Sequence, residues 1–471
     1  MARATSESRW RLPTIDLSRR LSASRLPCEG HTLRVRERIH PHTDEDRIEQ
    51  RDRAVLVGVD RSRADWPIEE SLEELQRLAE TAGADVVGTA TQRMERPHPK
   101  TFIGAGKAEE IVELAKNTGA NLVIFDDELS PRQQANVEDL LPDTRVLDRT
   151  ALILDIFGQH AVSREGKLQV DLARMEYSLP RLRGMWGHLT KERLGGGVGA
   201  RFGAGESQLE TDRRLTRKRI SELKRELASV AVERELQRKG RARGGVFRIA
   251  LVGYTNAGKS TLLNALTGAG VLSADMLFAT LDSTTRRMEL PEGRQVTITD
   301  TVGFINKLPH GLVEAFKSTL DEVNEADLLL YVTDASAGQR EAQMQAVREV
   351  LADIGAIDRP GVVVLNKWDL VDAQDRAALE KRYPQAACTA AATGEGIDRL
   401  IARIAEEAAR SSVTLSVRIP FTRGDLVAVA HEHAQIVSES HDEDGTRLIL
   451  RVPPEIAPQF RVFEIGADSN E

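Results

Sequence analysis

Residues 253–261 read Gly-Tyr-Thr-Asn-Ala-Gly-Lys-Ser-Thr, and they directly follow the apolar run Val246–Val252. The string fits the phosphate-binding pattern G-x-x-x-x-G-K-[ST], which ends here in Lys259 and Ser260. In this pattern glycines let backbone N–H groups surround a β-phosphate, the lysine reaches the β- and γ-oxygens, and the hydroxyl can ligate Mg²⁺. Leu262–Leu266 starts a helix whose N-terminus adds positive charge. Strand, loop and helix together predict an α/β nucleotide-binding domain; the alternative is a plain glycine-rich turn.

A second motif downstream indicates the base. The apolar run Val362–Leu365 ends in Asn366-Lys367-Trp368-Asp369, which fits N-K-x-D, the pattern of GTPases. A carboxylate at Asp369 can accept hydrogen bonds from the guanine N1–H and N2–H₂, a donor pair that adenine lacks. A mismatched base would leave that carboxylate unpaired, which discriminates strongly. We expect Asn366 and Lys367 to brace the loop; for these four residues alone, a surface turn is the alternative.

A weaker guanine motif follows in residues 390–396, which read Ala-Ala-Ala-Thr-Gly-Glu-Gly and align with S-A-x-T-G-x-G. Ala390 replaces the serine of the pattern. The contact expected here is a backbone N–H, from Ala391, to the guanine O6. The replacement should therefore preserve the contact while loosening the loop.

Between the two strong motifs, residues 300–303 read Asp-Thr-Val-Gly and fit D-x-x-G. We expect Asp300 to hold Mg²⁺ through water and the Gly303 N–H to meet the γ-phosphate. Many GTPases place a glutamine next, to orient the attacking water; this chain has Phe304. A phenyl ring cannot orient water, so intrinsic hydrolysis should be slow and depend on another group.

The segment 278–282, Phe-Ala-Thr-Leu-Asp, lies where a first switch loop belongs. Thr280 is our choice for the second hydroxyl on Mg²⁺, and Thr284 and Thr285 are alternatives. Loss of the γ-phosphate would release this loop and the D-x-x-G loop together, which is how such a domain signals.

Asn256, the fourth residue of the phosphate loop, matches a position at which several GTPases of this kind bind K⁺. Such an ion could supply charge to the phosphates; stabilisation of its own turn is an equal alternative. We assign catalysis to Lys259, Thr280, Gly303 and Asn256, and metal binding to Ser260 and Thr280. The residues predicted to bind GTP are Gly253, Tyr254, Thr255, Asn256, Ala257, Gly258, Lys259, Ser260, Thr261, Phe278, Ala279, Thr280, Leu281, Asp282, Asp300, Thr301, Val302, Gly303, Asn366, Lys367, Trp368, Asp369, Ala390, Ala391 and Ala392.

The composition is that of a globular protein. The chain has 471 residues, of which 41% are hydrophobic, enough for three domains with ample cores. It has neither a long uninterrupted apolar stretch nor an apolar signal core, so we expect a soluble, cytoplasmic monomer. Cys28 and Cys388 are far apart and indicate neither a disulfide framework nor a metal cluster.

The charge is unevenly distributed along the chain. The net charge is −8, yet residues 181–243 hold 17 lysines and arginines against 8 aspartates and glutamates. Such polarity suits an acidic chain that turns one face toward a phosphate backbone, whereas a solvated helix face is the equal alternative. The residues predicted to contact RNA are Arg193, Arg201, Arg213, Arg214, Arg217, Lys218 and Arg219.

Pattern divides the chain into five parts. They are a disordered extension (1–51), an N-terminal α/β domain with a parallel sheet (52–162), a helical hairpin (163–243), a GTP-binding domain (246–410) and a small C-terminal domain (413–471). In the hairpin, an apolar stripe at Ile220, Leu223, Leu227 and Val230 should pack on the first helix. The glycine-rich basic loop between the helices, which includes Trp186, suits ordering against RNA; a floppy linker is the alternative. In the last part, Leu415–Ile419, Leu426–Ala430 and Arg447–Val452 look like strands.

Together these features resemble the HflX family of ribosome-associated GTPases over about residues 52–467. The most specific string is Gly-Glu-Ser-Gln-Leu-Glu-Thr-Asp-Arg-Arg at 205–214, with 253–261, 277–282 and 300–305 in support. The resemblance implies a family N-terminal α/β domain with a hairpin, followed by a Ras-like P-loop domain. It also implies binding of the large ribosomal subunit, with the hairpin tip toward the peptidyl transferase centre, and a role in splitting or rescuing stalled ribosomes.

The chain departs from the family form in its glycine tract, residues 196–206, which is one residue longer, and at Ala390. Family members are also reported to bind adenine nucleotides in the N-terminal domain, for which 104–107, Gly-Ala-Gly-Lys, is a candidate turn here. A simple strand-to-helix turn is at least as good a reading. An RNA-remodelling NTPase that uses ATP at this domain is therefore the alternative function.

Overall fold

A computed structural model describes residues 51–465 except 62–65, 142–143, 183–203, 243–245, 269–276, 279, 292, 308, 310–311, 313–316 and 455. At 204–209, 233–242 and 317–319 it describes the backbone alone. Residues 1–50 of the predicted extension, which include Cys28, therefore lie outside the described residues, as do Trp186, Arg193 and Arg201 of the glycine-rich loop.

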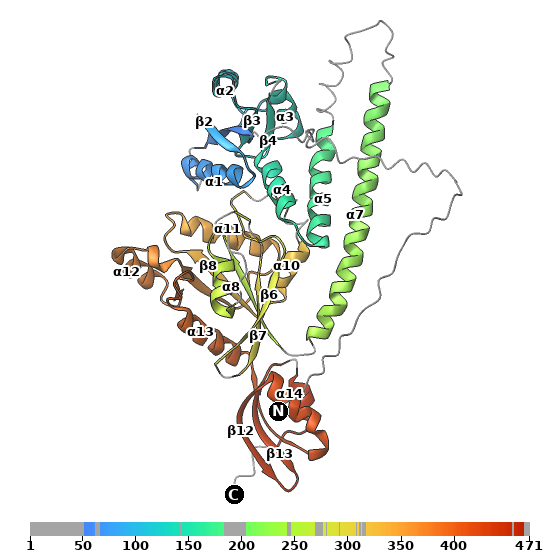
Figure 1. Cartoon of the computed structure of the whole chain (residues 1–471), viewed down its shortest axis with the longest axis vertical. Helices are drawn as coiled ribbons and strands as arrows, with labels where there is room; N and C mark the ends of the chain where they lie inside the picture. The colour runs from blue at the N-terminus through green and yellow to red at the C-terminus, as the bar shows by residue number, and fades with distance from the viewer. Residues whose placement is uncertain are drawn as a thin grey trace, which may run out of the picture. The chain divides into compact units, whose positions relative to one another are not determined.

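The N-terminal part is a four-stranded parallel sheet with strand order β2-β1-β3-β4 (Figure 1). Alternate residues of β1, one of the two inner strands, belong to two different hydrophobic cores. Ala54 and Leu56 belong to the core that contains α1 and α4, whereas Val55 and Val57 belong to the core that contains α2 and α3. Helices therefore cover both faces, which is why this strand has no polar side. The elements are β1 (Arg53–Asp60), α1 (Ile68–Thr81), β2 (Asp85–Arg93), α2 (Ala105–Thr118), β3 (Leu122–Phe125), α3 (Pro131–Glu138), β4 (Arg145–Asp148) and α4 (Arg149–His160).

The parallel α/β sheet predicted for this region is confirmed, but the helix α4 was not predicted. Asp148 caps this helix by accepting a hydrogen bond from the Ala151 N–H at 2.8 Å. Seven of its residues, from Arg149 to Phe157, are buried, so the helix has no polar face. A helix that is buried nearly all round gives no amphipathic periodicity to detect.

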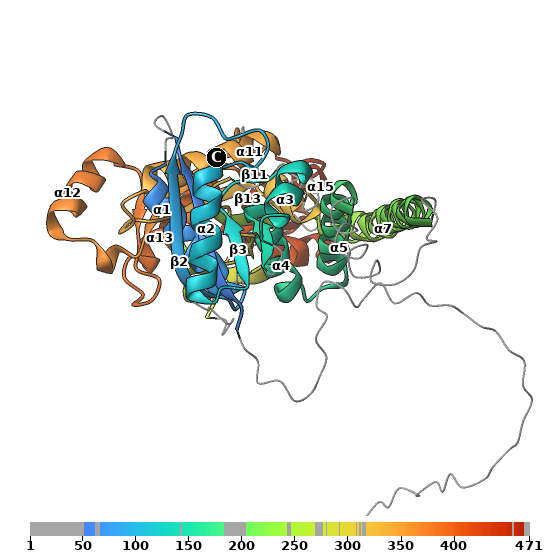
Figure 2. The same cartoon turned by 90° about the horizontal axis from the view of Figure 1, so that it is seen from above.

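The predicted hairpin helices are confirmed as α5 (Arg164–Ser178), which continues into η2 (Leu179–Arg181), and α7 (Ala204–Ala242). Both views show them side by side (Figures 1 and 2). Leu223 of α7 packs with Leu168 and Leu172 of α5, and Ile220, Leu227 and Val230 adjoin this cluster, as the apolar stripe predicted.

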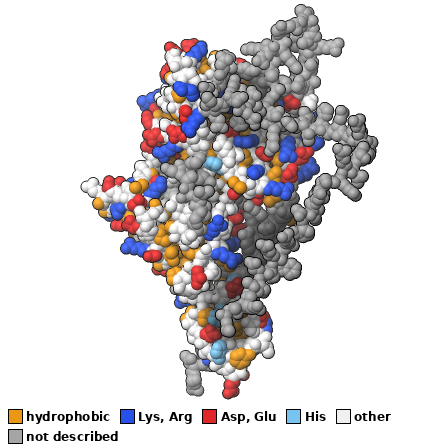
Figure 3. Space-filling model, in the orientation of Figure 1, with side chains coloured by type: hydrophobic (Ala, Val, Ile, Leu, Met, Phe, Trp, Pro, Cys, Tyr) orange, Lys and Arg blue, Asp and Glu red, His pale blue; other side chains and the backbone are white. Residues whose placement is uncertain are grey.

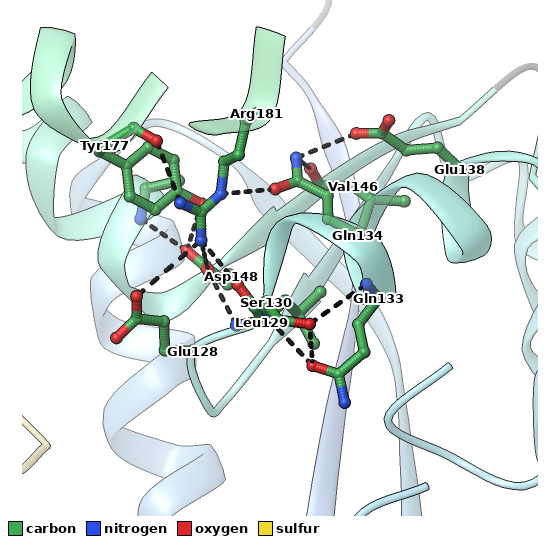
Figure 4. Close-up of polar contacts among 11 residues, drawn as sticks. Glu128, Leu129, Ser130, Gln133, Gln134, Glu138, Val146, Asp148, Tyr177 and Arg181 are labelled. Carbon is green, nitrogen blue, oxygen red and sulfur yellow. Dashed lines mark hydrogen bonds and ion pairs between the residues drawn. The ribbon is translucent and has the colours of Figure 1, made fainter. Parts of the chain in front are cut away.

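Arg181 fastens the far end of α5 to the N-terminal sheet (Figure 4). Its guanidinium donates to the carbonyl oxygen of Leu129 at 2.6 Å and to the side-chain oxygen of Gln134 at 2.9 Å. It also pairs with the Asp148 carboxylate at 3.3 Å and lies over the Tyr177 ring, 3.5 Å from its centroid. These contacts therefore hold the C-terminal end of the first hairpin helix against the N-terminal domain.

The next part is a six-stranded sheet with order β10-β9-β8-β5-β7-β6, in which β6 alone runs antiparallel to its neighbour. Its apolar strands lie between helices and place the ends of β5, β7 and β9 at one edge. The elements are β5 (Phe247–Gly253), α8 (Lys259–Thr267), β6 (Thr284–Glu289), β7 (Gln295–Asp300), α10 (Lys317–Asn324), β8 (Leu328–Asp334), α11 (Arg340–Asp353), β9 (Gly361–Asn366), η3 (Trp368–Leu370), α12 (Ala373–Arg382), β10 (Ala387–Cys388) and α13 (Ile397–Arg410).

The C-terminal part is an antiparallel sheet of order β11-β13-β12 with its own core. Two predicted strands are confirmed, but Leu426–Ala430 was wrongly predicted as a third: it lies in α14. Leu426 and Ala430 are both buried and lie four residues apart, one helical turn, while the run is apolar throughout and contains two β-branched valines, which favour a strand. The elements are β11 (Val413–Ile419), η4 (Phe421–Arg423), α14 (Gly424–His433), β12 (Gln435–Asp442), β13 (Gly445–Val452) and α15 (Ala457–Arg461). Across the described residues, no helix is long and apolar enough to cross a membrane.

Candidate nucleotide-binding site

The predicted phosphate loop joins β5 to α8, and close packing requires its glycines. Gly258 has a left-handed φ of 90°, and a Cβ there would lie 2.3 Å from Nδ2 of Asn366. A Cβ on Gly253 would lie 2.2 Å from the carbonyl oxygen of Val332. Neither position can hold a side chain without displacing its neighbours, so this conformation of the loop requires glycine at both positions.

Three side chains predicted to serve Mg²⁺ meet at this loop. The hydroxyl of Ser260 donates to Oδ2 of Asp300 at 2.6 Å, and the Thr280 hydroxyl lies 3.0 Å from both. Oδ1 of Asp300 is buried and has no hydrogen-bond partner among the described residues. Burial raises the pKa of this carboxyl, and hard oxygen donors are the ligands that Mg²⁺ prefers. The residues therefore fit the ion: Ser260 and Thr280 would hold it, with Asp300 beside them.

The structure brings Thr280, rather than the alternatives, to the Ser260 hydroxyl. Thr284 and Thr285 are the first residues of β6, and the Thr285 hydroxyl bonds that of Thr299 at 2.9 Å. Thr280 alone among these three threonines lies within hydrogen-bond distance of Ser260 in the described contacts.

Lys259 is buried and directed along the loop. Its Nζ donates to the carbonyl oxygens of Gly253 and Tyr254, at 3.1 and 2.8 Å. Burial lowers its pKa to about 8. A Cβ on Gly303 would lie only 3.1 Å from this Nζ, so the D-x-x-G loop and the lysine lie close together.

The two guanine motifs are joined by Asn366. Its Nδ2 donates to the Ala257 carbonyl at 2.9 Å, and its Oδ1 accepts from the Ala391 N–H at 3.1 Å. The N–H expected to face the guanine O6 thus bonds Asn366 in this structure. Lys367, with φ 57°, pairs through Nζ with Asp334 at 2.8 Å, and the Asp369 side chain is exposed beside it.

Several predicted GTP-site residues have side chains in the protein core. Trp368 is 5% exposed and packs with Leu365 and Leu379. The Thr301 hydroxyl donates to the Leu251 carbonyl at 2.7 Å, and Leu281 is 2% exposed. These side chains shape the loops, so any contact with the nucleotide would come from their backbone. Ala279 lies outside the described residues.

Phe304 is also a core residue, 1% exposed. Its carbonyl accepts from the Thr255 N–H at 2.7 Å, and its N–H donates to the Gly253 carbonyl at 3.1 Å. The residue at the position of the usual glutamine thus links the D-x-x-G loop to the phosphate loop. Its ring cannot reach or orient water.

A buried polar network, which no sequence motif predicted, joins the N-terminal domain to this site. Glu74 accepts a hydrogen bond from the Tyr254 hydroxyl at 2.5 Å, and that hydroxyl accepts from the Asn306 N–H at 2.6 Å. Arg149, which is 1% exposed, pairs with both Glu74 and Asp126. Tyr254 belongs to the phosphate loop, yet its partner lies 180 residues earlier, and no local pattern signals such a contact.

The candidate adenine-nucleotide turn is held by its own neighbours. Gly104 is the N-cap of α2, and its N–H donates to Oε1 of Gln92 at 2.8 Å. Lys107 pairs with Glu110 at 2.6 Å, on the same helix. This geometry fits the simple strand-to-helix turn.

Comparison with known proteins supports this description. Residues 69–158 match a family model described as GTP-binding GTPase N-terminal, 160–241 one described as GTP-binding GTPase Middle Region, and 248–367 one described as 50S ribosome-binding GTPase. Relatives named GTPase HflX include that of Caldanaerobacter subterraneus subsp. tengcongensis, 44% identical, covering 90% of this chain and 96% of the relative. That of Escherichia coli (strain K12) is 43% identical, covering 87% and 95%.

Among solved structures, a GTP-binding protein of Sulfolobus solfataricus in complex with GDP matches 76% of this chain and 99% of that one, at 26% identity and a TM-score of 0.41. The family rests on the sequence relatives, which the chain matches over nearly their whole length. The chain belongs to the HflX family of GTPases and is a GTP-hydrolysing enzyme.

Proposed function

We propose that this GTPase binds the large ribosomal subunit through the basic face of α7, splits or rescues stalled ribosomes, and uses GTP hydrolysis for release. The observation that carries the proposal is the division of α7 into two faces. One face packs on α5 through Leu223 and its apolar neighbours. Arg214, Lys218 and Arg225 lie four and seven residues apart on the opposite face, and all three are exposed.

Figure 3 shows Lys and Arg side chains over α5 and α7, with acidic side chains among them. Part of the predicted RNA-contact set is engaged within the chain. Arg219 pairs with Glu222 and Glu226, at 3.6 and 3.4 Å, and Arg213 is half-buried. Lys218 also pairs with Glu222, at 3.9 Å, but the face of Arg214, Lys218 and Arg225 is exposed and lies opposite the apolar face, so it is the better candidate for phosphate contacts. These pairs with acidic groups are exposed and weak, so rRNA phosphates can compete for the cations.

The test is a charge reversal with a matched control. Arg214, Lys218 and Arg225 are replaced together by glutamate, and the control replaces the exposed Lys116, Arg132 and Lys381, which lie on other helices. Co-sedimentation with large subunits is measured over a range of salt concentrations, with GDP and with a non-hydrolysable GTP analogue. We expect the α7 variant to bind more weakly and its log–log salt slope to fall by roughly three, about one per lost phosphate contact.

GTP affinity of the free protein should be the same in both variants, because these side chains lie far from the phosphate loop in sequence and on another helix. If the α7 variant co-sediments with an unchanged salt slope, this face does not contact rRNA phosphates and is only a solvated helix surface. Light scattering by whole ribosomes then tests splitting separately: a wild-type protein that binds the large subunit but leaves scattering unchanged would limit the proposal to binding.

A further inference from the structure

The first switch segment is bound to the corner between α4 and α5, on both sides of Thr280. Before Thr280, the carbonyl oxygen of Phe278 accepts a hydrogen bond from Nδ1 of His160 at 2.7 Å. The Phe278 ring also meets Phe157 edge to face, with centroids 4.6 Å apart. Phe278 has a φ of 57°, a backbone conformation that a bulky residue keeps only where its surroundings hold it.

After Thr280, the carboxylate of Asp282 lies on the N-terminus of α5. Its Oδ2 accepts the N–H groups of Val162 and Ser163, at 2.9 and 2.7 Å, and its Oδ1 accepts the Ser163 hydroxyl. The same hydroxyl caps α5 by accepting the Gly166 N–H at 2.9 Å. Sequence analysis placed Asp282 among the GTP-binding residues; its carboxylate here faces the helix.

Gly166 makes room for this contact. A Cβ at that position would lie 2.5 Å from Oδ1 of Asp282. The first turn of α5 and the Asp282 carboxylate are therefore fitted to each other. Bonds from backbone N–H groups to an ionised acceptor are among the stronger hydrogen bonds, and a helix N-terminus favours negative charge.

The two contacts leave Thr280 little freedom. Asp282 is two residues beyond Thr280, a span of at most about 7 Å of chain, and Leu281 between them is buried. The Thr280 hydroxyl lies 3.0 Å from the Ser260 hydroxyl and 3.0 Å from Oδ2 of Asp300. The first switch segment (residues 278–282, switch I) thus contacts the predicted metal ligands through Thr280 and α5 through Asp282.

We propose that Asp282 is a positioning residue for GTP hydrolysis: it fixes switch I on the N-cap of α5, so that Thr280 faces the Mg²⁺ site, and it passes the state of switch I to the hairpin helix. The proposal rests on the GTPase activity and the contacts above, independently of ribosome binding.

Two variants break the contact from opposite sides. Asp282→Asn removes the negative charge that faces the N-terminus of α5 and replaces one of the two accepting oxygens by an NH₂ group. Gly166→Ala places a methyl group against Oδ1 of Asp282 without altering switch I itself. The controls are matched. Asp372→Asn removes a carboxylate cap from α12, where Asp372 accepts the Gln374 and Asp375 N–H groups at 3.0 and 2.9 Å. Gly424→Ala adds a methyl group in the first turn of α14, where a Cβ would meet nothing within 4 Å.

The measurements are kcat and KM for GTP, and the affinities for GDP and for a non-hydrolysable GTP analogue with Mg²⁺, all on the full chain. For both contact variants we expect kcat to fall roughly tenfold and the analogue-to-GDP affinity ratio to fall about fivefold, with GDP affinity unchanged within about twofold. GDP affinity should persist because the phosphate loop and the guanine motifs are untouched. Both control variants should match the wild type within about twofold in every quantity.

Hydrogen exchange gives a readout that loss of a helix cap alone would not produce. In the wild type, amides 162–167 should exchange more slowly with the GTP analogue than with GDP, whereas in the contact variants the two nucleotides should give equal rates. The kcat and the affinity ratio of the double variant Asp282→Asn/Gly166→Ala should be no lower than those of either single variant, since both substitutions remove the same interaction.

The proposal is overturned if Asp282→Asn keeps the wild-type kcat and affinity ratio while these amides exchange faster, because Asp282 would then be a helix cap and nothing more. Additive losses in the double variant would overturn it as well. Should Asp282→Asn fail to fold, Gly166→Ala and Ser163→Ala, which keeps both backbone N–H donors, decide the question by the same measurements.

Discussion

Replacing Arg149 by methionine should destabilise the N-terminal domain by about 3–5 kcal/mol, the usual cost of removing one partner from a buried ion pair. The Arg149 guanidinium is 1% exposed and pairs with Asp126 at 2.6 Å and with Glu74. Without it, Asp126 would still pair with Lys307. The partner left to Glu74 among the described contacts is the Tyr254 hydroxyl, so most of the cost should arise at Glu74.

The loss should depend on pH. Burial raises the pKa of Glu74 even with Arg149 present, and removal of the guanidinium should raise it further. A carboxyl whose pKa is raised on folding contributes stability below its unfolded pKa and loses it as pH rises through the folded pKa. The loss of folding stability in Arg149→Met relative to the wild type should therefore be smallest near pH ~5 and grow toward pH ~8.

Hydrogen exchange of the α4 amides measures this loss locally, without assuming that the whole chain unfolds at once. The control is Arg145→Met. Arg145 and its partner Asp52 are 49% and 42% exposed, so that pair should contribute at most about 1 kcal/mol. Arg149→Met/Glu74→Leu should recover much of the loss, because the uncompensated carboxylate is gone. The reasoning is refuted if Arg149→Met is no worse than Arg145→Met, or if the double variant is as unstable as the single one.

Three further predictions concern the nucleotide site. Asp369→Asn should weaken GTP binding and favour xanthosine triphosphate, since an amide offers a donor to a base that presents an acceptor; an unchanged preference in a binding titration would remove Asp369 from the guanine site. Phe304→Gln should not accelerate hydrolysis by the free protein, because position 304 is buried and the water-orienting group comes from elsewhere; a roughly tenfold faster single turnover would contradict this. Replacing K⁺ by Na⁺ should slow hydrolysis if Asn256 helps to bind K⁺, and equal rates would favour the reading in which Asn256 only stabilises its turn.

The nucleotide site could be predicted because its determinants are local. Each motif lies at the end of a short apolar run, and parallel strands carry such ends to the same edge of a sheet. The Gly258 turn, the Ser260 hydroxyl and the Asp300 carboxylate therefore meet without any knowledge of distant packing. Thr280 was selected from three threonines by its place in the switch segment, and the structure brings its hydroxyl to Ser260.

Errors arose where local pattern and tertiary packing disagree. The run from Leu426 to Ala430 is short, wholly apolar and contains two valines, which is typical of a strand, but it forms a helix because Leu426 and Ala430 face one core. The hydrophobic stretch of α4 is buried nearly all round and so lacks periodicity. In both cases the deciding contacts are made with other elements, and propensity is a weak guide there.

The contacts between the N-terminal domain and the nucleotide site were the least accessible to sequence analysis, and they differ in what they can transmit. Glu74 binds Tyr254 in the phosphate loop, which would hold the α- and β-phosphates both before and after hydrolysis, so this contact can serve as a fixed pivot. Asp282 lies in switch I, which is the segment that changes when the γ-phosphate is lost. A domain that is held at a stationary loop and a moving loop together must rotate, strain or release one contact when the switch moves. On the proposal above, the Asp282 contact is the one that yields, because its loss frees the first turn of α5 while Arg181 keeps the other end in place.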